Sequence, residues 1–109
     1  MSAALVETGE AIRLAPQSGV AHFYRGRILY DLNRSTEAQL DLEAACKLVP
    51  LMPEPKYFLA FIAKQQGKPQ LAASLFEETV KLQPRNAMAW YRLGQSYEQL
   101  SESAKALKA

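Results

Sequence analysis

The chain repeats itself every 34 residues, and three prolines mark the period. Pro16, Pro50 and Pro84 close the aligned segments GEAIRLAP, EAACKLVP and EETVKLQP. Small residues keep the same spacing: Ala4, Ala38, Ala72 and Ala106, and likewise Gly26, Ala60 and Gly94. A fixed period of this size is typical of stacked-repeat architectures, in which each unit buries its apolar face against its neighbours. Such stacks usually present a surface for binding.

Cap and turn residues divide each unit into two helices. Proline biases the preceding residue out of the α region, so each periodic proline ends a second helix. The next helix begins after an N-cap, Ser18 or Asn86, or with Pro53 and Pro55 in its first turn, where a missing N–H costs little. The first helices end near periodic residues that can stop a helix or cap the next one: Asn33, Gly67 and Ser101.

The pattern predicts helices over about 2–14, 19–32, 36–48, 54–66, 69–82, 87–100 and 102–108. The linkers are short, so sequential helices should be antiparallel neighbours. Residues 57–63 are apolar throughout and could form a buried strand, but the repeat and the alanine content favour a helix. We therefore expect an all-α fold, an α-solenoid.

The repeat also divides the chain into units. Residues 1–18 form a half unit, 19–52 and 53–86 form complete units, and 87–109 form a truncated unit of one domain. Stacks normally end in atypical capping units with polar outer faces, and neither end looks like such a cap. The phase of the repeat therefore predicts a fragment, or one domain of a longer protein.

These residues resemble the tetratricopeptide repeat over nearly the whole chain. Its pattern is matched in full by the first-helix set Trp90, Leu93, Gly94 and Tyr97 and by the second-helix set Ala72, Phe76 and Pro84. The earlier units follow it with substitutions, such as His22 and Lys56 for the large aromatic and Leu42 for Phe76. The resemblance implies a right-handed superhelix of antiparallel helix pairs. The small residues should let paired helices approach closely, while larger ones fill the remaining space: Trp90, Tyr97, Phe76 and Leu42.

In a stack of this kind the first helix of each unit lines a concave groove. Spacing on those helices selects the candidate groove residues Phe23, Tyr24, Arg27, Tyr57, Phe58, Phe61, Lys64, Met88, Tyr91, Arg92 and Gln95. Aromatic walls with a few cations suit an extended or helical peptide that carries apolar anchors. The competing interpretation is that Tyr57, Phe58 and Phe61 simply pack against neighbouring units.

Some members of the family hold a C-terminal carboxylate with Lys, Asn and Arg residues of the groove. Of the corresponding positions here, only Arg92 matches. The departures are Phe23, Arg27, Phe58 and Met88. The resemblance therefore argues against a binder of heat-shock-chaperone tails.

The sequence offers no catalytic, cofactor or metal site. His22 and Cys46 are the only histidine and cysteine and fall on different predicted helices, whereas a nucleophile–base pair or a zinc site needs more partners. We interpret His22 as a partly buried structural residue and Cys46 as a small hydrophobe. Four carboxylates of the second helices are expected on a solvated outer face: Asp41, Glu43, Glu77 and Glu78.

The net charge is only +2, which predicts neither nucleic acid nor a membrane as the main partner, although Arg25, Arg27, Arg34 and Tyr24 could contact RNA. No secretory signal is visible, and we expect a cytoplasmic location. The leading hypothesis is a non-catalytic module that binds a peptide or protein. The alternatives are an accessory segment of a larger enzyme, for example one presenting substrates to a transferase, and self-association through uncovered terminal helices.

Overall fold

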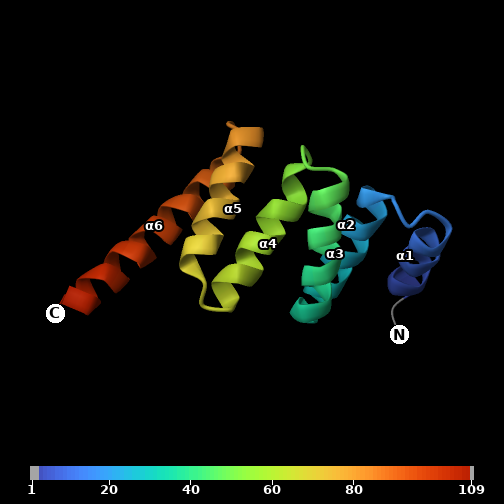
Figure 1. Ribbon diagram of the computed structural model, residues 1–109, viewed down its shortest axis with the longest axis horizontal. Coiled ribbons are helices and arrows are strands. Elements are labelled where there is room, and N and C mark those ends of the chain that lie inside the picture. The colour runs from blue at the N-terminus through green and yellow to red at the C-terminus, as the bar shows by residue number, and fades with distance from the viewer. Residues whose placement is uncertain (1–2, 109) are drawn as a thin grey trace.

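Within residues 3–108, six helices lie side by side in sequence order, from α1 at one end of a 54 Å long molecule to α6 at the other (Figure 1). The computed structural model describes the backbone of residues 3–108 and the side chains up to residue 102. The helices are α1 (Ala3–Leu14), α2 (Gly19–Asp31), α3 (Ser35–Leu48), α4 (Pro53–Gln65), α5 (Pro69–Leu82) and α6 (Ala87–Lys108). No strand occurs within residues 3–108, and residues 57–63 lie in α4. The expected all-α solenoid is confirmed.

The residues that punctuate the repeat act as the sequence predicts. The Ser18 hydroxyl accepts a hydrogen bond from the Ala21 amide at 3.2 Å, and the Asn86 side chain accepts one from the Ala89 amide at 3.0 Å. Asn33 and Gly67 have φ angles of 62° and 73°, the left-handed conformation that ends a helix. These caps and stops set the boundaries of α2, α4 and α6.

The predicted break at Ser101 is wrong, because α6 runs from residue 87 to residue 108 without interruption. The two matching positions earlier in the chain are Asn33 and Gly67, which adopt positive φ with little strain. Serine does so less readily, and its helix propensity is only modestly below that of alanine. No glycine, asparagine or proline follows Asn86 except Gly94, so nothing local forces the helix to stop.

The small periodic residues bring first and second helices together in two pairs, α2 with α3 and α4 with α5. A Cβ placed on Gly26 would lie 2.9 Å from Leu42 Cγ and 3.3 Å from the Ala38 carbonyl oxygen. Ala38 and Leu42 of α3 are completely buried, as is Ala72 of α5. Both pairs therefore pack as the period predicts, and each contributes to a hydrophobic core cluster.

The first helix of the last unit, α6, is packed differently. Ala89 and Leu93 of α6 pack in the core cluster with α5, the second helix of the unit before it. Within residues 3–108 no second helix of its own unit follows, because α6 continues straight where the pattern calls for a turn. Trp90 is 50% exposed and Tyr97 is 47% exposed, and a Cβ placed on Gly94 would meet nothing within 4 Å. The prediction that Trp90 and Tyr97 fill the space between two helices is therefore wrong in this structure.

A side-chain donor closes the turn after each repeat proline. The proline carbonyl oxygen is bonded six residues on by His22 Nε2 at 3.0 Å (Pro16), Lys56 Nζ at 2.6 Å (Pro50) and Trp90 Nε1 at 2.8 Å (Pro84). By spacing alone this position looks like a packing site at which His22 and Lys56 depart from the aromatic pattern. The property that the three side chains share is an N–H donor, which explains why they can replace one another.

The two glycines at the same repeat position should respond oppositely to alanine. We expect Gly26→Ala to lower the free energy of unfolding by about 1–2 kcal/mol, because its Cβ would overlap the buried Leu42 side chain. We expect Gly94→Ala to raise it by about 0.5–1 kcal/mol, because the methyl group meets open space while alanine favours a helix. Urea unfolding of both variants checks the prediction, and a shift of the same sign in both would contradict the assigned packing.

Candidate functional site

Side-chain contacts connect most of the candidate groove residues into one cluster across α2, α4 and α6, which we call the aromatic ribbon. Its members are Phe23, Tyr24, Arg27, Tyr57, Phe58, Phe61, Tyr91, Arg92 and Gln95. Its α2 and α4 part joins Phe23 to Tyr24 with ring centroids 5.4 Å apart and to Phe58 at 6.0 Å. Tyr57 then contacts Phe58 at 6.1 Å and Phe61 at 4.9 Å, edge to face. Tilted and T-shaped contacts of this kind hold rings in defined positions.

Two arginines extend the ribbon and connect it to α6. The Arg27 guanidinium lies 5.8 Å from the Phe58 ring centroid. The Arg92 guanidinium lies 5.2 Å from the Phe61 centroid and 5.7 Å from the Tyr91 centroid, so it bridges α4 and α6. Such cation–π contacts orient a cation while leaving its N–H groups available to other acceptors.

The polar end of the ribbon is a short hydrogen-bonded chain on α6. Arg92 donates from Nη1 to Gln95 Oε1 at 3.1 Å, and Gln95 donates from Nε2 to the Tyr91 hydroxyl at 3.1 Å. Arg92 Nε is buried and has no hydrogen-bond partner among the described residues. Buried polar groups are nearly always paired, so Arg92 Nε is an exception among the described residues.

The candidate residues differ widely in how much surface they offer. Tyr91 is 58% exposed, Tyr24 and Met88 are about half exposed, and Arg27 is also exposed. The partly buried members are Tyr57, Phe58, Phe61, Lys64, Arg92 and Gln95. Phe23 is only 3% exposed and belongs to the core cluster around Leu42, so it supports the ribbon from below.

The aromatic residues in the middle of the ribbon are partly exposed and also pack against the core. Phe61 contacts the buried Phe76 of α5 at 5.6 Å, and Tyr57 contacts it at 5.7 Å. Tyr30, which the groove selection omitted, packs edge-on against Phe58 at 5.5 Å. Its spacing could have revealed it, because Tyr30 follows Phe23 by two helical turns on the same face of α2. These residues both stabilise the stack and form its surface.

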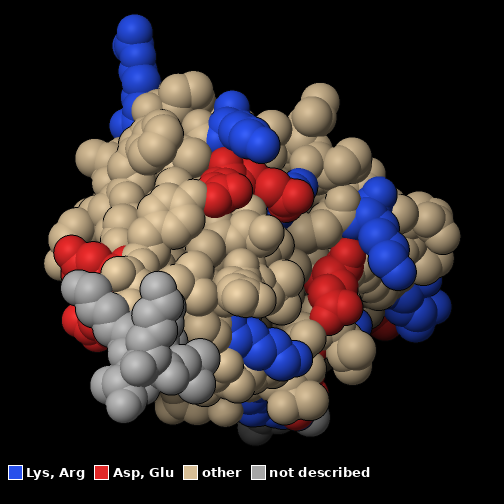
Figure 2. Space-filling model, turned by 60° about the vertical axis from the view of Figure 1, so that its left-hand side comes forward, with Lys and Arg blue, Asp and Glu red and all other residues tan. Residues whose placement is uncertain are grey.

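Charge on the molecular surface is mixed in sign. Figure 2 shows Lys and Arg side chains lying beside Asp and Glu in several places, separated by uncharged surface. Arg13, Arg25 and Arg34 each form an ion pair with a carboxylate. Among the residues whose side chains are described, Arg27 and Arg92 have no such pair. The unpaired arginines are thus those of the aromatic ribbon, together with Arg85.

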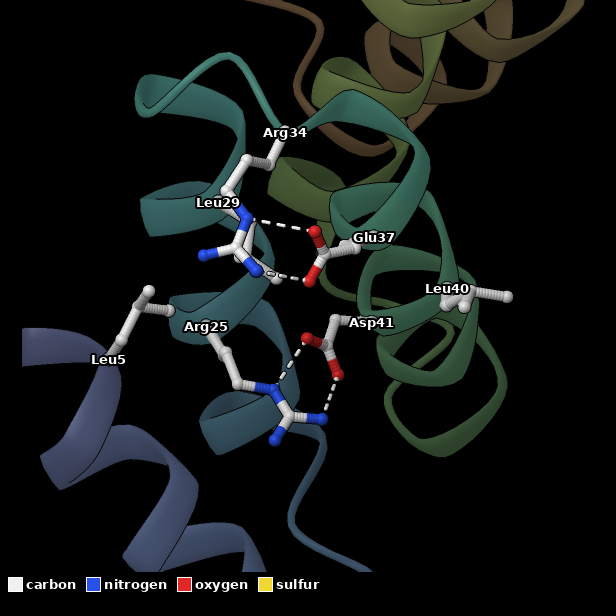
Figure 3. Close-up of a pocket in the computed structure, with 7 residues that line it drawn as sticks. All are labelled: Leu5, Arg25, Leu29, Arg34, Glu37, Leu40 and Asp41. Carbon is white, nitrogen blue, oxygen red and sulfur yellow. Dashed lines mark hydrogen bonds and ion pairs between the residues drawn. The ribbon is translucent and has the colours of Figure 1, made fainter. Parts of the chain in front are cut away.

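Asp41 lies in a buried network, which corrects its expected place on a solvated outer face. Its carboxylate accepts hydrogen bonds from Arg25 Nε at 2.6 Å and Nη2 at 2.8 Å (Figure 3). His22 Nδ1 lies 3.0 Å from the same carboxylate. The hydrogen bonds to Asp41 raise the pKa of Arg25 above its ordinary value, although partial burial opposes this. Asp41 is buried because α2 supplies partners for its charge.

Figure 3 shows a second pair beside the first, between Arg34 and Glu37 at the start of α3, with Leu5 of α1 on the opposite wall of a pocket and Leu40 pointing away. Each arginine in this pocket is bound to a carboxylate through two nitrogens, so the charges are compensated. Two of the three arginines proposed for RNA contact are therefore occupied. The network therefore stabilises the packing of α2 against α3.

The remaining reactive side chains are in structural settings. Burial raises the pKa of the Cys46 thiol, which favours the protonated form. Tyr97 donates a hydrogen bond to Glu77, and this bond raises the pKa of the phenol. Within the described residues, no three His, Cys, Asp or Glu side chains are grouped so that they could hold a metal ion. In the same residues, no helix combines the length and the apolar character needed to cross a bilayer.

Comparison with known proteins agrees with the architecture. Residues 59–109 match the family model described as tetratricopeptide repeat. Cell division cycle protein 27 homolog A of Arabidopsis thaliana is 31% identical over 95 residues, which are 87% of this chain. The chain spans only 13% of the length of that relative.

Solved structures of two kinds resemble the fold closely. One is the first tetratricopeptide domain of Spaghetti (RPAP3) bound to the HSP90 peptide SRMEEVD, with a TM-score of 0.84 and 18% identity, over 89% of this chain and 77% of that one. Another is the MamA protein, with a TM-score of 0.83 and 20% identity, over 95% of this chain and 57% of that one. At these identities the likeness concerns the fold.

Proposed function

The chain belongs to the tetratricopeptide repeat family, and from that premise we propose that it is a non-catalytic module that binds a peptide segment of another protein along the aromatic ribbon. The observation that carries the proposal is the coincidence, on the first helices, of exposed rings with the arginines that have no ion pair. Tyr24 and Tyr91 stand at the two ends, and Arg27 and Arg92 lie between them. The domain of RPAP3 with a similar fold holds a peptide, which gives the proposal a precedent.

The chemistry of the ribbon indicates what the peptide carries. Rings at Tyr24, Phe58 and Tyr91 offer flat apolar contacts for aliphatic or aromatic anchors. Arg27 is exposed and has no ion pair, so its guanidinium can bind a backbone carbonyl or a carboxylate of the peptide. The partner is therefore an apolar segment with an acceptor placed between its anchors. An accessory role in a larger enzyme would use the same surface, and no contact here favours it over simple binding.

A peptide selected on the wild-type protein from a random display library should bind Tyr91→Ala at least tenfold more weakly, because this ring is an exposed aromatic contact of the kind that dominates interfaces. Its thermal unfolding should change little, since the ring is mostly in solvent. Isothermal titration calorimetry measures the affinity. Phe61→Ala is less suitable, because Phe61 packs on Phe76 and its loss would also weaken the fold.

Leu40→Ala is the matched control, because Leu40 is an exposed large apolar residue of α3, away from the ribbon. It should bind the selected peptide as the wild type does. Equal affinity in Tyr91→Ala and Leu40→Ala would remove the ribbon as the binding site. Failure of the wild type to select any peptide would remove the proposed function itself.

A further inference from the structure

A cleft opens between the second helices α3 and α5, with α4 at its base; Figure 1 shows α4 lying between the other two. Both second helices pack on α4 and make little contact with each other, which leaves a hollow of about 290 Å³. The cleft lies within the two complete helix pairs of the stack, and none of its lining residues belongs to the aromatic ribbon.

The base and one wall of this cleft are apolar. Leu59, Ile62 and Ala63 of α4 are buried at its base and belong to the two core clusters. Leu71 and Leu75 of α5 form the wall, and Leu71 remains 47% exposed. A leucine exposed beside a buried aliphatic base offers a contact that an apolar side chain of another molecule can complete.

An amide pair closes one end of the cleft. Gln66, at the end of α4, donates a hydrogen bond from Nε2 to Gln39 Oε1 of α3 at 2.9 Å. Because each amide already has a partner, this end does not require a polar group from a ligand. The unsatisfied charge of the cleft lies further along α3 and α5.

Two carboxylates mark that other end. Glu43 lines the cleft, and Glu78 follows Leu75 by one turn on the same face of α5. Burial is the main cause that raises the pKa of the Cys46 thiol; Lys56 lowers it, and Glu78 and Glu43 both raise it, so both carboxylates act on one point of α3. Both are exposed, and neither forms an ion pair among the residues whose side chains are described.

We propose that an amphipathic helix of a partner protein docks in this cleft, with aliphatic side chains against Leu71 and with lysines or arginines beside Glu43 and Glu78. The stripe of α5 from Leu71 to Glu78 covers two helical turns, roughly 10 Å at 1.5 Å per residue. That length fits the apolar anchors of a docked helix, which recur at i, i+3 or i+4, and i+7. The occupant is basic, whereas the ribbon carries unpaired arginines, so this inference does not depend on peptide binding at the ribbon.

Nuclear magnetic resonance with a defined probe tests the proposal. The probe is a synthetic helical peptide of leucine and lysine, with the leucines on one face, titrated into ¹⁵N-labelled wild-type protein up to about 1 mM. Saturable amide shifts should concentrate around Gln39, Glu43, Gln66 and Leu71. A twin peptide with glutamate in place of every lysine should bind the cleft about tenfold more weakly, because its charges would repel Glu43.

The apolar contact is tested by Leu71→Ala, which should weaken binding of the leucine–lysine peptide about tenfold. Its thermal unfolding should change little, since the Leu71 side chain is half exposed. Leu51→Ala is the matched control, because Leu51 is 80% exposed in the turn between α3 and α4 and lies outside the cleft. It should bind the peptide as the wild type does.

The charged contact is tested by two changes of opposite sign on α3. Glu43→Lys should weaken binding of the leucine–lysine peptide about tenfold, and Lys47→Glu, one turn further on, should strengthen it. Glu7→Lys makes the same change of net charge as Glu43→Lys, but on an exposed position of α1, and should have a much smaller effect.

Several results would overturn the proposal. They are the absence of saturable shifts at the cleft below about 1 mM peptide, shifts that map to the aromatic ribbon instead, and equal affinity for the glutamate twin. Equal binding by Leu71→Ala and Leu51→Ala would remove the cleft as the site. Sedimentation equilibrium of the wild type without peptide should show a monomer, and self-association that Leu71→Ala abolishes would make a second copy of the chain the occupant in place of a basic partner.

Discussion

The Ala72→Glu variant is expected to be unfolded at 25 °C. Ala72 is 0% exposed and lies in the core cluster between α4 and α5, beside Ala60 and Phe76. A carboxylate there would have no ion partner, and an isolated buried charge costs several kcal/mol. A domain of this size is typically stable by only about 5–15 kcal/mol, and the variant also overpacks a close helix contact. Far-ultraviolet circular dichroism should show loss of most helix signal and no cooperative melt.

Ser74→Glu is the control for Ala72→Glu, because Ser74 is exposed on the same helix. It adds the same charge and should change the free energy of unfolding by about 0.5 kcal/mol or less. If Ala72→Glu melted cooperatively within a few degrees of Ser74→Glu, the packing of α5 on α4 by the repeat register would be wrong.

Phe76→Ala should have the second largest effect, a loss of about 3–5 kcal/mol in the free energy of unfolding. Phe76 is completely buried and holds both Tyr57 and Phe61 by edge-to-face contacts at 5.7 and 5.6 Å. Its removal leaves a cavity beneath the aromatic ribbon, so peptide affinity should fall with stability. Guanidinium unfolding measures the loss. Leu40→Ala truncates an exposed apolar residue and should cost about 0.5 kcal/mol or less, and similar values for both variants would contradict the assigned core.

The period of the sequence was sufficient to predict the helix pairs, because each pairing depends on residues that recur in it. Gly26 meets Leu42 as predicted, and Ser18, Asn86 and Gly67 cap or stop helices by local chemistry that a sequence displays. Such features need no knowledge of the rest of the molecule.

The predictions that were wrong concern residues whose surroundings depend on partners that the repeat period does not encode. Asp41 looked like a solvated carboxylate, but Arg25 on another helix pairs with it, and no repeat position requires an arginine there. Trp90 and Tyr97 looked like packing residues because the pattern presumes a second helix after Ser101. Since serine tolerates a continuing helix, α6 extends and both rings remain about half exposed.

Within the candidate site, spacing identified which face of each first helix carries the candidate residues, but it could not predict how deeply each side chain is buried. Phe23, Tyr57 and Tyr91 hold the same repeat position, yet they are buried, partly buried and exposed respectively. Phe23 is covered by its neighbours Tyr24 and Phe58, whereas Tyr91 has Arg92 and Gln95 beside it. Depth therefore follows from the next helix in the stack, which differs from unit to unit.

The claim that the first helices form the binding face is tested most directly by nuclear magnetic resonance. A peptide selected from the display library is titrated into uniformly ¹⁵N-labelled wild-type protein, and the amide shifts are mapped by residue. We expect the largest shifts on α2, α4 and α6 around Tyr24, Phe58 and Tyr91, with little change in α3 and α5 outside their contacts with these helices. Shifts concentrated on the outer surfaces of α3 and α5, around Leu40 or Glu78, would contradict it.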